Sequence, residues 1–356
     1  MKLAPLVIGD LTVKVPIIQG GMGVGISRAN LAAAVANEGG MGVISGVQIG
    51  FAEPDFETNT LEANKRALIK EIRKAKALSP HGVIGVNFLV AMNHYDEIAK
   101  TAVDEGIDII ISGAGLPTNL PEIVKGSNTK IAPMASSGRT ASVICKMWDK
   151  RYHRIPDLIV VEGTEAGGHL GFSMEDLTAE VKPSLDDIVK DILEVIKPYE
   201  EKYGRKIPVV AAGGIFTGKD VAHYLSLGAS AVQIATRFIA TEECDAHINF
   251  KNAIIQAKDG DIKLIKSPVG MPGRALKNKF LEKMEFTPIM AEKCSECMKA
   301  CKINQAPYCI SEALIHAVNG DVENGLVFSG ANAHRITEIV TVKELMGELV
   351  REAEEI

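Results

Sequence analysis

The sequence predicts an α/β protein whose core is a (β/α)8 barrel, and three observations support this fold. Eight short apolar runs recur along the 356 residues. Each run is followed by glycine or polar residues and then by apolar residues at helical spacing, as in "LEANKRALIKEIRKAKAL" (61–78). The runs themselves are nearly continuously apolar, which is typical of parallel strands covered by helices. The chain length suits such a barrel with insertions.

Eight strand–helix units favour a closed barrel over an open doubly wound sheet. A dinucleotide-binding alternative would begin at "GGMGVG" (20–25), but the G-x-G-x-x-G spacing is absent and no acidic residue ends the next strand. We therefore expect the barrel. Its predicted strands are "VPIIQ" (15–19), "MGVIS" (41–45), "VIGVNF" (83–88), "IDIIIS" (107–112), "TKIAPM" (129–134), "DLIVVE" (157–162), "PVVAA" (208–212) and "SAVQIA" (230–235).

Two connections are longer than the others. The second carries "GVQIGFAEPDFETNT" (46–60), and the sixth runs from Gly163 to a helix that ends near Tyr203. Loops that follow barrel strands lie on the catalytic face, so this length predicts substrate walls. Helices are expected near 245–257 and 342–354. We expect a barrel formed by 1–257 with 341–356, covered by a loop-rich appendage of 258–340.

The composition excludes several classes of partner. The chain is 46% hydrophobic and 24% charged, as in an ordinary globular enzyme. Its formal charge is −6 and no block of Lys and Arg stands out, so no nucleic-acid partner is expected. The sequence contains no run of about 18 apolar residues, so no membrane-spanning helix is expected. The N-terminal "MKLAPLVIGDLTVKVP" lacks a signal-peptide pattern, which indicates a cytoplasmic protein.

Small residues at the predicted strand ends indicate a phosphate-containing cofactor. Gly213 and Gly214 follow the seventh strand, and Ala235 and Thr236 follow the eighth, where barrels commonly hold phosphate. A single glycine there is explained equally well by a turn, but the paired arrangement favours phosphate binding. Polar side chains at other strand ends, Asn87 and Gln233, either cap the strands or bind a flavin ring. We therefore expect bound FMN.

The string "VVEGTEAGGHLGF" (160–172) ends a strand in an acid, glycines and a histidine. It belongs to a set with "PIIQGGMG", "GVNFL", "SGAGLP", "PVVAAGGI" and "GASAVQIATRF", which resembles the nitronate monooxygenase family (the older 2-nitropropane dioxygenases). The set resembles equally the sister group of FMN-dependent enoyl-acyl carrier protein reductases. The resemblance runs from about residue 4 to 240 and resumes at "GMPGRALKNK" (270–279) and "SGANAHRI" (329–336).

This resemblance implies an FMN-binding TIM barrel in which His169 is the active-site histidine. A histidine after two glycines is by itself more often structural than catalytic. With the whole string of residues 160–172 in place, we expect the catalytic role instead. The cofactor contacts implied by position are Gly21, Met22, Asn87, Glu162, Gly167, Gly168, Gly213, Gly214, Gln233, Ile234, Ala235 and Thr236.

The favoured activity is oxidation of alkyl nitronates with O2 to a carbonyl compound and nitrite. His169 would orient the anionic nitronate or accept a proton from a neutral nitroalkane, titrating near the usual imidazole pKa. The alternatives are an NAD(P)H-dependent enoyl-acyl carrier protein reductase and an NAD(P)H:quinone reductase. "GMPGRALKNK" resembles the reductases' P-x-R-A-x-x-N, whereas "SGAN" (329–332) replaces the "GQ" usual in both groups. The expected partner is a small molecule; NAD(P)H and a homodimer stay open.

Functions outside the oxidoreductases are less well supported. A phosphosugar isomerase or lyase would need a lysine or paired acids at strand ends, and Glu162 with Glu165 is the only such acid pair. A non-catalytic binding protein would leave His169 and the long loops unexplained.

Four cysteines crowd into "CSECMKACKINQAPYC" (294–309), with the spacing C-x2-C-x3-C-x7-C. Without a secretory signal, disulfides are the poorer explanation. Four thiolates at this density suit a [4Fe–4S] cluster or a structural Zn site, and four reduced cysteines are the alternative. The first three spacings resemble the cluster motif of barrels of the old yellow enzyme and dienoyl reductase type. The candidate ligands are Cys294, Cys297, Cys301 and Cys309.

Overall fold

The computed structural model describes residues 2–289, 294–302 and 304–356. Among these residues, eight parallel strands close into a barrel in the order β10-β11-β3-β4-β5-β6-β7-β8. Each overlaps one predicted strand, so the predicted barrel is confirmed and the open-sheet alternative is wrong. The strands are β3 (Ile17–Gln19), β4 (Met41–Ser45), β5 (Val83–Leu89), β6 (Ile109–Gly113), β7 (Lys130–Ala135), β8 (Ile159–Glu162), β10 (Val209–Ala212) and β11 (Ala231–Ile234).

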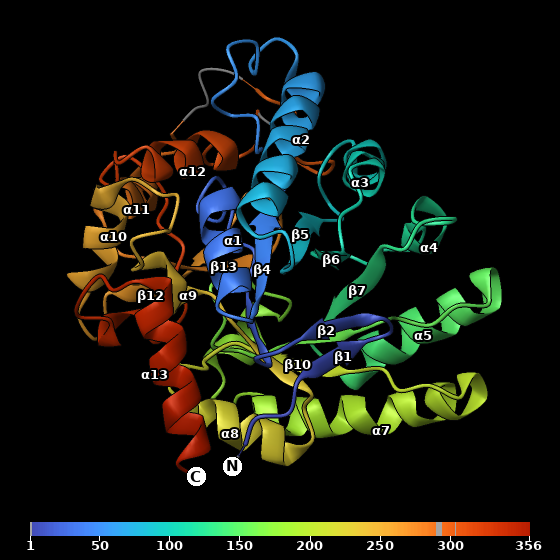
Figure 1. Cartoon of the computed structure of the whole chain (residues 1–356). Helices are drawn as coiled ribbons and strands as arrows, with labels where there is room; N and C mark the ends of the chain where they lie inside the picture. The colour runs from blue at the N-terminus through green and yellow to red at the C-terminus, as the bar shows by residue number, and fades with distance from the viewer. Residues whose placement is uncertain (1, 290–293, 303) are drawn as a thin grey trace.

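Helices surround this barrel (Figure 1). Helix α7 shows why they form: its buried residues recur at helical spacing from Leu185 to Ile196. The Ser184 side chain caps its N-terminus, and Gly204 ends it with a φ of +60°. The outer helices are α1 (Ala29–Asn37), α2 (Thr60–Leu78), α3 (Tyr95–Asp104), α4 (Leu120–Ile123), α5 (Gly138–Tyr152), α7 (Leu185–Tyr203), α8 (Gly218–Leu227) and α13 (Val342–Glu354).

A short hairpin that the sequence analysis did not predict closes one end of the barrel. Its strands are β1 (Leu6–Ile8) and β2 (Leu11–Val13). Leu6, Ile8 and Val13 share a hydrophobic cluster with Ile18 and other residues from the barrel strands. Figure 1 shows the hairpin away from the long loops at the other ends of the strands. The opposite end of the barrel is therefore left for the functional site.

The described residues of the segment 258–340 pack onto the barrel and share its core. Ala317, Val318 and Val327 belong to the same buried cluster as Val232 and Phe238 of the barrel. The elements of this segment are β12 (Ile262–Lys266), β13 (Pro272–Leu276), α11 (Lys279–Phe286), α12 (Ile310–Val318) and the 3-10 helix η1 (Ala333–Arg335). The preceding helix α10 (Ile248–Ile255) lies within its predicted range, and α13 starts and ends at the predicted residues.

One small sheet joins this segment to the loop that follows β8. Strand β13 pairs with β12 and also with β9 (Gly168–His169), so that Gly273 lies opposite His169. The same loop continues into the short helix α6 (Met174–Thr178), while α9 (Thr236–Ile239) follows β11 directly. The chain after the barrel thus sets the position of the histidine.

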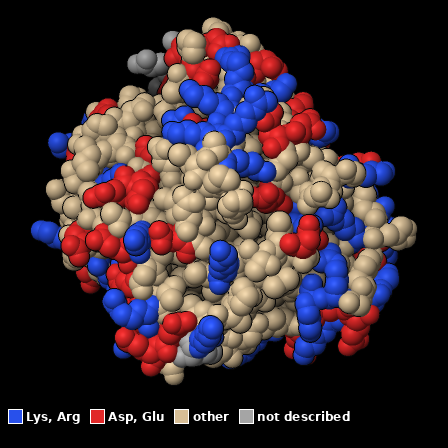
Figure 2. Space-filling model, in the orientation of Figure 1, with Lys and Arg blue, Asp and Glu red and all other residues tan. Residues whose placement is uncertain are grey.

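The charged surface does not form one continuous basic face in the view of Figure 2. Lys and Arg gather over α2, with acidic side chains around them. Several of these cations are in ion pairs: Arg66 with Asp55, and Arg73 with Glu105 at 2.7 Å. Within the described ranges, the helices are all too short or too polar to cross a bilayer.

Candidate active site

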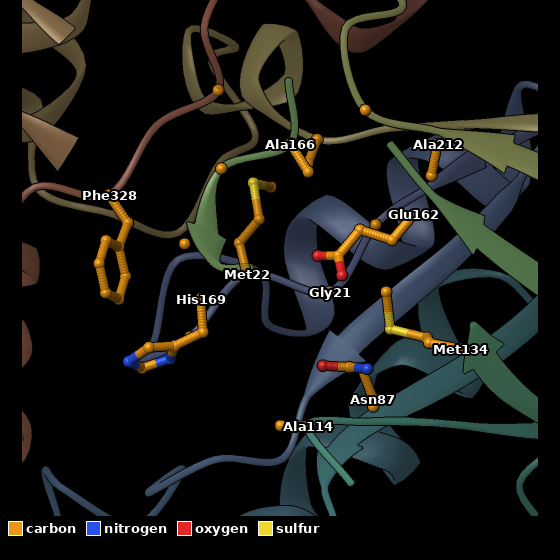
Figure 3. Close-up of a pocket in the computed structure, with 18 of the residues that line it drawn as sticks. Gly21, Met22, Asn87, Ala114, Met134, Glu162, Ala166, His169, Ala212 and Phe328 are labelled. Carbon is orange, nitrogen blue, oxygen red and sulfur yellow. The ribbon is translucent and has the colours of Figure 1, made fainter. Parts of the chain in front are cut away.

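A cavity of about 430 Å³ opens at the carboxyl ends of the barrel strands. Figure 3 shows residues from several strands and loops around one space, with Glu162 and Asn87 pointing into it. His169 and every residue predicted to contact the cofactor line this cavity. The predicted residues brought together are Gly21, Met22, Asn87, Glu162, Gly167, Gly168, His169, Gly213, Gly214, Gln233, Ile234, Ala235 and Thr236.

Three buried polar atoms in the cavity wall have no hydrogen-bond partner within the protein. They are Ser45 Oγ, Gln233 Oε1 and Ser329 Oγ. A buried polar group without a partner costs about 1–3 kcal/mol, so such groups are rare in folded proteins. Three of them around one cavity fit a bound molecule that carries donors and acceptors, as the ring and ribityl chain of a flavin do.

The glycines of the site serve the packing of the protein as well as any ligand. A Cβ on Gly21 would lie 2.5 Å from the Asn87 Cβ, and one on Gly167 would lie 2.5 Å from the Gly330 nitrogen. Gly213 and Gly214 have φ values of +97° and +91°, which disfavour other residues. The structural explanation for single glycines therefore holds alongside the cofactor hypothesis.

The segment 329–332 lies against the predicted phosphate site. The Gly330 N–H donates to Thr236 Oγ1 at 2.9 Å, and the Asn332 amide donates to the Gly214 carbonyl at 2.8 Å. Asn332 also donates to Glu165 Oε2 at 3.2 Å. The segment "SGAN" (329–332) therefore supports the loops after β10 and β11.

Glu162 holds the loop after β8 in its folded-back path. Its Oε2 accepts from the Gly171 N–H at 2.9 Å, and Ser136 donates to the Gly171 carbonyl at 2.8 Å. Burial raises the pKa of Glu162 to about 7, although the bond from Gly171 acts in the opposite direction. The acid in the string of residues 160–172 thus has a structural role beside its predicted cofactor contact.

His169 is held by two residues of the segment 258–340. Its Nε2 lies 2.7 Å from Ser267 Oγ, and its ring meets Phe328 edge-on, with the centroids 5.0 Å apart. Figure 3 shows the His169 and Phe328 rings side by side at the cavity. Burial lowers the pKa of His169 to about 4, so the imidazole is neutral around pH 7. This differs from the expected titration near the usual imidazole value.

The sequence analysis missed Ser267 and Phe328. Both lie far along the chain from His169, and neither stands in a motif that signals a contact with it. The pairing of β13 with β9 is what brings this segment beside the histidine. Two motifs, "GMPGRALKNK" (270–279), which contains β13, and "SGANAHRI" (329–336), marked that part of the chain as related to the site.

The four clustered cysteines surround a second cavity, of about 300 Å³. All four are free thiols. Across 2–289, 294–302 and 304–356, no three His, Cys, Asp or Glu side chains are arranged to hold a metal ion. The structure thus brings the four cysteines together without forming a compact single-ion site.

A barrel with a cofactor-sized cavity at its strand ends is typical of barrel enzymes that bind a cofactor. Comparison with known proteins identifies the family. The family model described as nitronate monooxygenase matches residues 5–352. The chain therefore belongs to the nitronate monooxygenase family and is a flavin-dependent oxidoreductase.

Individual relatives agree with this assignment. A probable nitronate monooxygenase of Staphylococcus saprophyticus is 29% identical over 303 residues, covering 80% of this chain and 81% of that protein. The structure of FabK from Thermotoga maritima has a TM-score of 0.73 and 27% identity, covering 96% of this chain and 93% of its own. A nitroalkane oxidase from Streptomyces ansochromogenes has a TM-score of 0.72 at 23% identity, covering 96% of both chains, which is a likeness of fold.

Proposed function

We propose that the large cavity binds FMN. Gly213, Gly214, Ala235 and Thr236 would hold its phosphate through backbone N–H groups, because they lie at the ends of neighbouring strands β10 and β11. The remaining predicted contacts, including Met22, Asn87 and Gln233, would hold the ring and the ribityl chain. The unpartnered Gln233 Oε1 is the strongest single support, since a flavin donor would satisfy it.

We further propose that the substrate is a small alkyl nitronate. When bound, the flavin supplies the redox chemistry that takes electrons from the nitronate and passes them to O2. The task of the protein is to bind and orient the anion. The observation that carries this proposal is that the curated relative spanning most of the chain is a probable nitronate monooxygenase.

The surroundings of His169 suit this substrate. Val269, Met271 and Phe328 line the cavity with apolar surface that an alkyl chain can contact. The neutral imidazole would donate a hydrogen bond to a nitronate oxygen. An imidazole whose pKa is lowered to about 4 is a weak base, so we favour this orienting role over removal of a proton from a neutral nitroalkane.

An enoyl-acyl carrier protein reductase is the second candidate. Its support is the P-x-R-A-x-x-N segment, which forms β13 and pairs directly with the strand that carries His169. In that case NAD(P)H would supply the electrons and an enoyl thioester would accept them. A quinone reductase would share the electron donor but not the acceptor.

A comparison of substrates separates these functions. With a short alkyl nitronate, the purified protein is expected to consume O2 and release nitrite, and NADH alone is expected to be oxidised slowly or not at all. The measurement pairs an oxygen electrode with a nitrite assay, and it follows NADH absorbance with and without a crotonyl thioester. Rapid NADH oxidation that depends on the crotonyl thioester, without nitrite release from the nitronate, would replace our proposal by the reductase.

A further inference from the structure

The cavity around the four cysteines, which the proposed function does not use, has the features of a built site. Cys294, Cys297, Cys301 and Cys309 all line it. Cys294 is exposed and the other three are partly buried. Four cysteines of one sixteen-residue stretch thus line the same cavity.

The first part of this stretch is fixed to the barrel. The Asn93 N–H donates to the Cys297 carbonyl at 3.1 Å, and the Lys299 N–H donates to the Ala91 carbonyl at 3.0 Å. The Lys299 side chain also donates to the Val90 carbonyl at 2.9 Å. The loop after β5 therefore holds Cys297 and its neighbours in place, and the site is part of the folded enzyme.

The two metal centres that the sequence allows differ in how closely they need the four sulfurs to approach one point. A tetrahedral zinc ion needs four sulfurs each about 2.3 Å from one point. The described residues offer no such compact set. A [4Fe–4S] cluster binds one cysteine at each of its iron atoms, so its ligands surround a larger centre. Four cysteines that line one cavity of about 300 Å³ are compatible with the larger centre.

The cysteine cavity lies next to the cavity proposed to hold FMN. Cys297, Met298 and Ile310 line both the cysteine cavity and the large cavity proposed to hold FMN. A redox centre at the cysteines would be separated from the flavin cavity by this shared wall. A site placed at random on the surface would have no such wall in common.

We propose that Cys294, Cys297, Cys301 and Cys309 bind a [4Fe–4S] cluster beside the flavin cavity. The proposal concerns occupancy of the cysteine cavity and is independent of which substrate the flavin oxidises or reduces. It predicts a second chromophore in the protein, one that responds to oxygen and to iron supply.

The test is metal and sulfide analysis of the full chain produced and purified without oxygen. We expect about four iron and four acid-labile sulfide per chain, and a paramagnetic signal after reduction with dithionite. Each of Cys294→Ala, Cys297→Ala, Cys301→Ala and Cys309→Ala should lose most of the iron. The matched control is Cys145→Ala, because Cys145 is buried in the barrel core. This variant should keep its iron. Flavin absorbance and circular dichroism check the fold of each variant.

Three results would overturn the proposal. The first is stoichiometric zinc without iron. The second is a protein without metal, even after anaerobic reconstitution with iron and sulfide, in which all four thiols react with a thiol reagent in the folded state. The third is unchanged iron in all four folded cysteine variants. None of these readouts depends on nitronate oxidation, so failure here is distinguishable from failure of the proposed function.

Discussion

Replacing His169 by alanine is expected to lower kcat/KM for an alkyl nitronate about 10²- to 10³-fold while the protein stays folded and yellow. The loss is that of one preorganised hydrogen-bond donor to an anionic oxygen. Flavin should be retained, because the proposed phosphate contacts come from the loops after β10 and β11 and not from the imidazole. The measurement is steady-state oxygen uptake, with flavin content from the visible spectrum.

The matched control is His223→Ala, since His223 lies on α8 and pairs with Asp186 at 2.9 Å outside the cavity. It should keep full activity. If His169→Ala also keeps full activity with the flavin bound, His169 is a structural residue of a glycine-rich loop.

The pH dependence adds a second readout of the same residue. Burial lowers the pKa of His169 to about 4, so the ring takes up a proton only well below the neutral range and is neutral above it. Between roughly pH 6 and 8 the wild type and His169→Ala should therefore show parallel profiles. Burial raises the pKa of Glu162 to about 7, so we expect an inflection in this range to be shared by both proteins and to come from that carboxyl group. An inflection in this range that the wild type shows and the variant lacks would contradict the neutral imidazole.

Ala235→Leu is expected to yield a folded protein that has lost nearly all of its flavin. Ala235 lines the cavity at the start of α9, and its φ of −120° is negative and already adopted by a residue that carries a Cβ. A leucine side chain there would occupy the space proposed for the phosphate without straining the backbone. Gly214 is a poorer test, because a side chain at its φ of +91° would strain the loop whatever the ligand. The measurement is the ratio of flavin to protein absorbance, with a thermal melt to verify folding.

A suitable control adds the same side chain elsewhere. Gly347→Leu places it on α13, where an added Cβ meets no heavy atom within 4 Å. This variant should remain yellow. Full flavin content in a folded Ala235→Leu protein would contradict the proposal that the loops after β10 and β11 hold the phosphate.

The barrel was predictable because its strands and helices carry local signals. Strand β4, for instance, is the continuous run "MGVIS", and α7 shows apolar residues at helical spacing between a serine cap and a glycine. The strand ends of a parallel barrel meet at one rim, so residues predicted there, such as Asn87 and Gln233, had to converge. All of the proposed cofactor contacts do line one cavity.

What the sequence could not predict depends on contacts between distant segments. The pairing of β13 with β9, and with it the Ser267 bond to His169, has no local signature. The lowered pKa of His169 follows from burial by those same segments, so it was equally out of reach. The hairpin of β1 and β2 was missed because neither of its short strands is followed by apolar residues at helical spacing, the pattern that marked the barrel strands. The shared wall between the two cavities likewise appears only once the chain is folded.

Anaerobic reduction of the bound flavin by an alkyl nitronate tests the central claim most directly, because it observes the first electron transfer without turnover. Mixing the purified protein with the nitronate in the absence of O2 should bleach the visible flavin absorbance rapidly, and admitting air should restore it with release of nitrite. His169→Ala should bleach roughly 10²- to 10³-fold more slowly at the same nitronate concentration. A flavin that stays oxidised with nitronate but bleaches at once with NADH would contradict the account.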